Sequence, residues 1–267
     1  MPKPNRVIYT CVTGNYDRVY PPVTTSGDVQ FIMLTDDDTL SVPGWNVKVI
    51  SPSKDLSPSL QNRHCKIFPW KYIQDTDESI YVDGNVRILS DLSGIFSHLD
   101  GHHDVVLLRH PKREFVHEEI ESCVQLKKVN DRTSLDNEYA ELIKRGFIDH
   151  GMLTENNVII RSHNSMAAKE AMQIWWEFVT KYSGRDQISL HYALSASAAK
   201  VKILPVNAKK TNPYFDIYPH MGTKKTYLER KIVHLSARKS EGVFWCILHK
   251  TLKKLYKKIK KYNNSNC

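Results

Sequence analysis

Short hydrophobic runs alternate along the chain with longer stretches in which apolar positions recur every three or four residues. The short runs predict strands at 6–12, 30–34, 45–50, 80–82, 104–108, 157–160, 201–204 and 232–235. The helical spacing predicts helices at 58–73, 91–99, 115–129, 135–145, 166–181, 187–198 and 243–262. Such alternation indicates an α/β fold, a mostly parallel sheet flanked by helices on both faces.

The last part of the chain differs from the rest in its pattern. Residues 207–230 have proline, glycine, lysine and tyrosine but no period, and we expect a loop that borders a site. Beyond it, Leu248, Leu252, Leu255, Ile259 and Tyr262 form one apolar stripe of a helix. We therefore predict two parts, an α/β domain at 1–242 and a basic amphipathic tail at 243–267.

Composition is that of an ordinary globular domain. The 267 residues are 41% hydrophobic and 25% charged, which is sufficient for one large core. No apolar run approaches the roughly 18 residues of a membrane-spanning helix. The five cysteines lack Cys-x-x-Cys spacing, which indicates neither a zinc site nor a disulfide framework. Because the N-terminus is also unlike a signal peptide, we expect a cytoplasmic protein.

The positive charge is concentrated in the tail. The formal net charge is +9, and seven lysines with no acidic residue follow Phe244. Removing these seven from the 38 basic residues leaves 31 against 29 acidic ones, so the body is almost neutral. That balance argues against nucleic acid as a partner. A basic amphipathic helix instead predicts that the protein docks peripherally on the inner, anionic face of a membrane. The alternative is a terminal helix that packs on the body of the protein.

The most informative stretch is Ser79–Arg87, where an apolar run leads to Asp83, Gly84 and Asn85. Open α/β sheets bind ligands at the carboxyl ends of their strands. Carboxylate and amide oxygens are ligands that Mg²⁺ and Mn²⁺ prefer. Asp83 and Asn85 are therefore candidate metal ligands, although an Asp-Gly turn between two elements would look the same.

Other polar residues are placed to join this site. Arg63 and Lys66 lie three apart on one predicted helix, where they could meet a phosphate or simply face solvent. Asp186 stands at a helix start, as a cap or as a ligand for a sugar. Two late histidines compete for a metal-ligand role: His234, followed by Lys239 as a phosphate ligand, and His220, which has similar His-to-Lys spacing.

Five motifs occur in a recognisable order: Tyr9–Asp17, Arg63–Ile67, Tyr81–Asn85, His110–Glu119 and Gly184–Ile188. With them, the chain resembles the GT-A glycosyltransferases from about Arg6 to Lys239. Within that group it resembles a family first catalogued as a domain of unknown function, found in bacterial polysaccharide loci and plant Golgi proteins. The layout is also similar to the family 8 glycosyltransferases, in which an Asp-x-Asp follows a strand and a late histidine completes the metal site.

The resemblance implies roles for the matching positions. Asp83 and Asn85 correspond to the Asp-x-Asp and His234 to the histidine, so that Mn²⁺ or Mg²⁺ would be bound; asparagine at the second position reduces the negative charge there. The remaining positions would contact a nucleotide-sugar, with Asp186 and Gln187 near the transferred sugar as candidate catalytic residues. The nucleotide-side candidates are Thr13, Gly14, Asn15, Tyr16, Asp36, Arg63, Lys66, Asp83 and Lys239.

The resemblance thus implies a metal-dependent enzyme that moves a sugar from a nucleotide-sugar donor, a UDP-sugar being favoured, to a glycan or lipid-linked glycan acceptor in surface polysaccharide synthesis. The alternative is a catalytically silent nucleotide-sugar or glycan binding module held at a membrane. The asparagine at position 85 keeps this alternative open.

Overall fold

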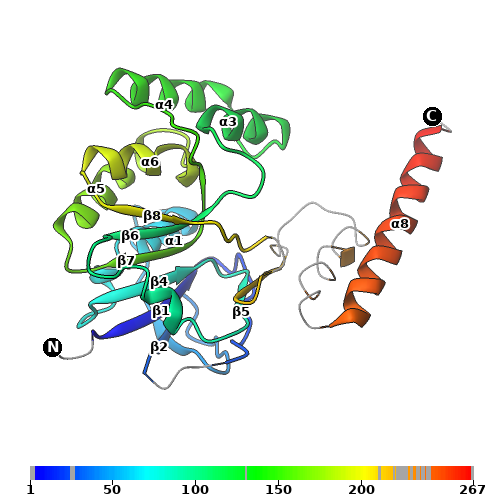
Figure 1. Ribbon diagram of the computed structural model, residues 1–267, viewed down its shortest axis with the longest axis horizontal. Coiled ribbons are helices and arrows are strands. Elements are labelled where there is room, and N and C mark those ends of the chain that lie inside the picture. The colour runs from blue at the N-terminus through cyan, green and yellow to red at the C-terminus, as the bar shows by residue number, and fades with distance from the viewer. Residues whose placement is uncertain are drawn as a thin grey trace.

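The computed structural model describes residues 4–24, 28–129, 131–209, 212–218, 220, 228, 231–232, 235, 238 and 242–265. Its centre is a seven-stranded sheet with the order β3-β2-β1-β4-β7-β6-β8 (Figure 1). The strands are β1 (Arg6–Val12), β2 (Gln30–Thr35), β3 (Asn46–Val49), β4 (Glu78–Val82), β6 (Val105–Arg109), β7 (Thr154–Ser162) and β8 (Val201–Leu204). Only β7 runs antiparallel to its neighbours; the other pairs in the sheet are parallel.

Alternate residues of the strands feed two separate cores, because successive side chains point to opposite faces of a sheet. Tyr9, Tyr81 and Ile159 pack with α1 (Pro58–Ile67), α5 (Met166–Lys181) and α6 (Asp186–Ala196). Ile80 and Val158 face the other way, towards α2 (Ser93–Phe96) and a two-stranded ribbon. That ribbon pairs β5 (Val86–Ile88) antiparallel with β9 (Phe215–Ile217).

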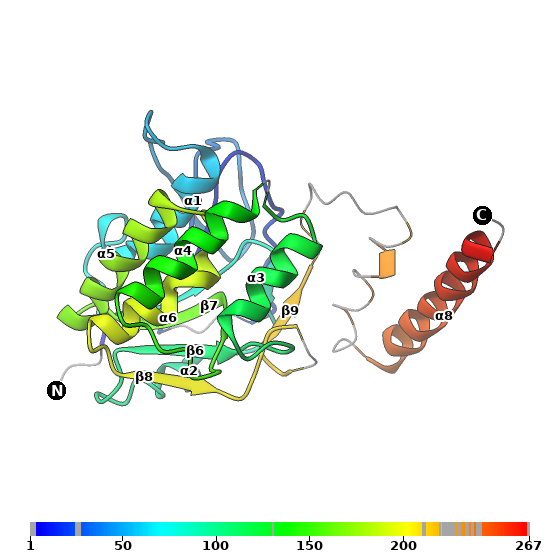
Figure 2. The ribbon, with the colours of Figure 1, turned by 90° about the horizontal axis from the view of Figure 1, so that it is seen from above.

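Two further helices form a third layer on α6, as both ribbon views show (Figures 1 and 2). They are α3 (Val116–Gln125) and α4 (Arg132–Lys144). The C-terminal helix α8 (Val243–Ser265) stands apart from the α/β body in the same two views. Among the described residues, no helix has the length and apolarity needed to cross a bilayer.

The α/β class, the mostly parallel sheet and its helical cover are as predicted, whereas several boundaries were wrong. The helix predicted over 58–73 ends at Ile67, because Pro69 cannot continue it, and a short 3-10 turn (Pro69–Lys71) follows. Two elements, β5 and β9, were missed; β9 lies inside the predicted loop 207–230. The strand predicted at 232–235 is wrong, since Ile232 and Leu235 are helical.

A buried arginine fixes the end of α1. Arg161 of β7 is fully buried and donates to the carbonyl oxygens of Lys66 and of Ile67, the latter at 3.2 Å. It also donates to the Tyr9 hydroxyl at 2.6 Å, which itself bonds the Lys66 carbonyl at 3.0 Å. The last carbonyls of a helix lack partners within it, so these side chains satisfy groups that would otherwise be buried alone. Through these bonds, the sheet fixes the position of the Lys66 backbone at the end of α1.

Replacing Arg161 by alanine should lower the free energy of unfolding by about 3 kcal/mol or more, because several buried acceptors lose a charged donor. Urea unfolding followed by circular dichroism measures this. The matched control is Arg109→Ala on β6, whose side chain is 56% exposed and pairs with Glu114; an exposed pair contributes about 0–1 kcal/mol. Equal losses in the two variants would contradict the anchoring role.

Candidate active site

Three charged side chains from different elements meet beyond the end of β4. Lys66, in the last turn of α1, places its Nζ 2.6 Å from Asp186 Oδ2 and 3.4 Å from Asp83 Oδ1. Asp83 follows β4 directly, and Asp186 is the first residue of α6. The Lys66 side chain is only 5% exposed. A single buried ammonium therefore links two carboxylates that lie about a hundred residues apart in the chain.

The charges around Asp186 keep it ionised. Burial alone would raise the pKa of this carboxyl, but Lys66 first, and then Arg63 and Arg185, outweigh burial and hold the pKa well below its usual range. Asp186 thus remains a carboxylate at all physiological pH values. In chemical terms it is an acceptor, an electrostatic stabiliser or a nucleophile, and it has no proton to donate.

The backbone of Asp186 is fixed as firmly as its side chain. Its carbonyl oxygen accepts a hydrogen bond from the buried Trp175 indole and another from the Asn156 amide, each at 2.9 Å. The neighbouring Gln187 donates from Nε2 to the Thr154 carbonyl at 3.3 Å. The start of α6 is therefore tied to both α5 and β7. Trp175 and Asn156 were not among the predicted site residues, and no motif singles them out.

The turn after β1 packs on the start of α1 and is bonded to the turn after β2. The Gly14 N–H donates to the Asp36 carboxylate at 2.9 and 3.1 Å, and Thr13 Oγ1 donates to the Pro58 carbonyl at 2.6 Å. Gly14 has a φ of +63°, and a Cβ here would lie 2.6 Å from Pro58 Cβ. The geometry therefore requires glycine. Asn15 follows with a φ of 51°, so two left-handed residues shape this turn.

Tyr16 extends the same turn towards the charged centre. Its side chain is exposed, and its ring lies 5.2 Å from that of His220. Partial desolvation of its hydroxyl, together with the charge of Asp17, raises the pKa of Tyr16, while Arg63 and Arg185 act in the opposite direction. The hydroxyl is thus close enough to both arginines for their charges to lower its pKa. Thr13–Tyr16, Asp36 and the Lys66 centre lie at one edge of the sheet.

Asn85 and His220 lie side by side. Asn85 is buried, donates from Nδ2 to the Tyr218 carbonyl at 2.8 Å and lies 3.5 Å from His220 Nε2. His220 Nδ1 is 2.9 Å from the Asp17 carboxylate. Asp83, Asn85 and His220 are residue types whose oxygen and nitrogen atoms Mn²⁺ accepts, and the described contacts join Asn85 to His220. Between the two candidate histidines, His220 is the one the structure describes beside Asn85.

The remaining predicted ligands lie outside the described residues. His234 and Lys239 fall in positions that the structure does not describe. Across the described ranges, three or more His, Cys, Asp or Glu side chains nowhere gather in a way that could hold a metal ion by themselves. Any ion at Asp83 therefore needs further ligands, from a bound molecule or from the part of the chain not described.

The motif His110–Glu119, whose role the sequence left open, forms a charged support beneath Arg185. Glu119 is fully buried; its carboxylate pairs with Arg113, and it lies 3.8 Å from Lys128 and 4.0 Å from Arg185. His110 accepts the Arg113 N–H at 2.8 Å, and burial lowers the pKa of His110 to about 4, so the ring stays neutral. Spacing alone could not reveal the contact between Glu119 and Arg185, since it joins α3 to the residue before α6.

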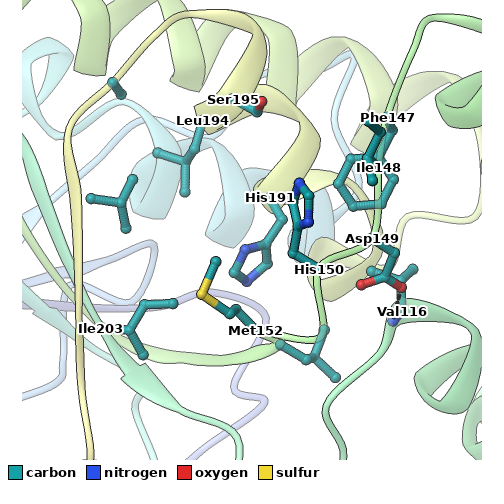
Figure 3. Close-up of a pocket in the computed structure, with 13 residues that line it drawn as sticks. Val116, Phe147, Ile148, Asp149, His150, Met152, His191, Leu194, Ser195 and Ile203 are labelled. Atoms are coloured by element: carbon teal, nitrogen blue, oxygen red, sulfur yellow. Dashed lines mark hydrogen bonds between the residues drawn. The ribbon is translucent and has the colours of Figure 1, made fainter.

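A cavity of about 450 Å³ lies between α6, the segment 147–153 and β8 (Figure 3). None of the predicted site residues lines it. Its walls are mainly apolar, and they include Phe147, Ile148, Met152, His191, Leu194 and Ile203. His191 connects it with β7, since its Nε2 lies 3.0 Å from the Thr154 hydroxyl.

Comparison with known proteins gives a family match and several distant structural likenesses. Residues 1–212 match the family model described as TOD1/MUCI70, glycosyltransferase-like domain. None of the curated proteins matches the chain. The apo structure of the bifunctional glycosyltransferase WbbM is similar, with a TM-score of 0.49 and 11% identity; the match covers 90% of this chain but 45% of WbbM.

Two structures of the galactosyltransferase LgtC are similar over 77% of this chain and 74% of theirs. One is a complex with donor and acceptor sugar analogues, with a TM-score of 0.40 and 12% identity. The other is an active-site mutant, with a TM-score of 0.43 and 10% identity.

The Lys66 bridge predicts a pH-dependent loss of stability in Lys66→Met. In the native protein the lowered pKa of Asp186 stabilises the fold above the unfolded pKa of about 3.9, and this is lost as pH falls through the folded value. Without Lys66, the buried carboxylate loses its main partner and its pKa rises. The deficit should reach about 3 kcal/mol or more near neutral pH and shrink towards about pH 3, below the unfolded pKa.

Urea unfolding of both proteins at the two pH values measures this deficit. Lys54→Met, which removes an exposed lysine just before α1, is the matched control and should change the free energy of unfolding by less than about 0.5 kcal/mol. A deficit of the same size at both pH values would mean that Lys66 stabilises the fold without acting through the carboxylates.

Proposed function

Because the chain belongs to the TOD1/MUCI70 glycosyltransferase-like family, we propose that it transfers a sugar from a nucleotide-sugar to a glycan or lipid-linked glycan acceptor in surface polysaccharide synthesis. The observation that carries this proposal is the Lys66 bridge between Asp83 and Asp186, with Arg63 and Arg185 acting on the same carboxylate. Sugar transfer needs cations for a leaving diphosphate and a fixed carboxylate at the sugar, and these groups supply both.

The donor is held by two sets of residues. The turn Thr13–Tyr16 and Asp36 receive the nucleoside of a UDP-sugar, and Arg63 and Lys66 receive its diphosphate. Arg63 supports this assignment, because its Nε is buried and has no hydrogen-bond partner among the described residues. Nη1 of Arg63 donates to Ser59, and an arginine whose Nε–H is still unpaired is suited to bind an oxyanion such as phosphate.

During transfer, negative charge develops on the diphosphate as the bond to the anomeric carbon breaks. Arg63 and Lys66 stabilise that charge in place, without reorganising, because both are fixed on α1. Asp186, which stays ionised, accepts hydrogen bonds from the sugar or stabilises positive charge at its anomeric carbon, and Gln187 lies beside it. A divalent cation, Mn²⁺ or Mg²⁺, when bound at Asp83, Asn85 and a histidine, would act as a Lewis acid towards the phosphates.

The donor set fits a cation that arrives with the nucleotide. Asp83 is already 3.4 Å from Lys66, and Asn85 contributes no charge. Phosphate oxygens would supply the hard ligands that the described residues lack. His220 is the described candidate for the imidazole ligand, and His234 remains the alternative.

A second candidate function is binding without turnover, and the observation in its favour is Asn85 in place of a second carboxylate. Isothermal titration with UDP and Mn²⁺, together with a donor-hydrolysis assay over UDP-, GDP- and CMP-sugars, separates the two. Binding without turnover of any donor would favour the silent module.

The Asp83→Ala variant should abolish donor turnover, by at least about a hundredfold, while the fold persists. Asp83 lies beyond the end of β4 and its side chain is 30% exposed, so the core loses little. Hydrolysis of the best donor in the panel and the circular dichroism spectrum report on the two effects. Asp136→Ala, an exposed carboxylate on α4, is the control. Full turnover in Asp83→Ala would show that the site is misplaced.

We also propose that α8 holds the protein on the inner face of an anionic membrane, with its acceptor. Two features support this. Phe244, Ile247, Leu248, Leu255 and Ile259 expose apolar side chains on one face of the helix. The lysines around them each contribute about 1 kcal/mol near an anionic surface. Trp245, His249, Leu252 and Tyr256 are less exposed and form the adjoining face.

The Leu255→Ser/Ile259→Ser double variant should bind phosphatidylserine-containing vesicles at least about tenfold more weakly than the native chain, since apolar burial is lost while every lysine remains. Vesicle co-sedimentation measures the binding. Leu126→Ser/Ile143→Ser is the matched control, because these exposed apolar residues lie near α3 and on α4. Unchanged binding in the α8 variant, or none by the native chain, would contradict the proposal.

A further inference from the structure

The turn that presents Asp186 is held from beneath by a buried carboxylate. Residues 183–186 read Ser-Gly-Arg-Asp, and Gly184 has a φ of +67°. The Ser183 hydroxyl donates to Glu138 Oε2, and the Ser183 N–H reaches the same oxygen at 3.4 Å. The hydroxyl oxygen in turn accepts the Arg185 N–H at 3.1 Å. Glu138 therefore contacts the turn three residues before the start of α6.

Glu138 is a carboxylate at a position where burial is unfavourable in free energy. It lies on the inner face of α4 and is fully buried. A buried carboxylate costs free energy unless a cation pairs with it, and no ion pair is found for Glu138 among the described residues. Its carboxylate accepts hydrogen bonds from Ser183, and the Ser189 hydroxyl of α6 also acts on it. An apolar side chain would pack between α4 and α6 at lower cost, so stability does not explain this glutamate.

We propose that Glu138 is a positioning residue for Asp186: its ionised carboxylate orders the Ser183–Asp186 turn and so sets the carboxylate that faces the sugar. The inference rests on the proposed glycosyl transfer for its functional part, while its structural part concerns the turn alone. The path runs through two hydrogen bonds, from Glu138 to Ser183 and from Ser183 to the Arg185 N–H.

The ionisation of Glu138 makes the arrangement sensitive to pH. Burial raises the pKa of Glu138 to about 7, although the hydroxyls of Ser183 and Ser189 and the charge of Arg185 act in the opposite direction. These three are the groups that face it from the turn and from α6. Above that pH the carboxylate accepts both bonds from Ser183; below it, the protonated group competes as a donor. The ordered turn therefore forms as pH rises through about 7.

The same shift means that Glu138 disfavours folding at neutral pH. The folded pKa of Glu138 lies above its unfolded pKa of about 4.3. The contribution of Glu138 to stability is therefore fully present below about pH 4.3 and is lost as pH rises through the folded pKa of about 7. A neutral glutamine should therefore leave the protein at least as stable at about pH 8. Any loss of function in Glu138→Gln then cannot be ascribed to unfolding.

The test uses Trp175 as a reporter, because its indole N–H donates to the Asp186 carbonyl at the end of this turn. In the native full-length protein, the ¹H–¹⁵N resonance of that indole, assigned with Trp175→Phe, should titrate with a midpoint near 7. The titration should vanish in Glu138→Gln and in Ser183→Ala. The kcat for the best donor should fall about tenfold in both variants, with KM within about twofold, as expected for misplacement of a reacting group.

The double variant should be no worse than either single one, since both act through one contact. Glu141→Gln, one turn along α4 and paired with Arg145, should leave the resonance and kcat unchanged. A Trp175 resonance that does not titrate in the native protein, or that titrates equally in Glu138→Gln, overturns the proposal. If the native chain turns over no donor, glycosyl transfer fails, while the resonance still decides whether Glu138 orders the turn.

Discussion

The ammonium group of Lys66 is the interaction on which the site depends. Asp186 is buried, and burial alone would raise its pKa. The Lys66 Nζ, 2.6 Å from Asp186 and 3.4 Å from Asp83, outweighs that effect for Asp186 and pairs with both carboxylates. Because the three residues belong to α1, α6 and the end of β4, this one contact also joins the helical layer to the sheet.

Lys66 can link the two carboxylates because buried residues of the sheet fix its own position. Arg161 and Tyr9, both buried in strands, bind the carbonyl oxygens at the end of α1. On the other side, Glu119 lies beneath Arg185, and Glu138 beneath Ser183. The charged groups of the proposed donor site are thus held in place by buried charged groups outside it. Such support keeps a site within the narrow geometry that catalysis requires.

The sequence predicted the strands and the helical layers because each has a strong local period. It singled out Asp83 at the end of a strand, Asp186 at the start of a helix and Lys66 three residues after Arg63 on one helix, and the structure brings Asp83, Lys66 and Asp186 together. It could not predict β5 and β9, each three residues long, since a ribbon so short has no period of its own. It also missed Glu138, Trp175 and Arg161. Their roles depend on which helices and strands lie together, and a single sequence does not encode that in any spacing.

The charges around Asp186 also bear on the proposed donor. Asp83 and Asp186 are the two carboxylates next to Lys66, and Arg63 and Arg185 are two further cations close to Asp186. Arg185 also lies 4.0 Å from the buried Glu119, so part of its charge is already paired. In the proposed function, Arg63 and Lys66 are therefore the cations that a diphosphate would meet. A ligand that binds only the folded state stabilises it, and the more so the more tightly it binds. The pairing of these cations in the protein thus bears on stability and donor binding together.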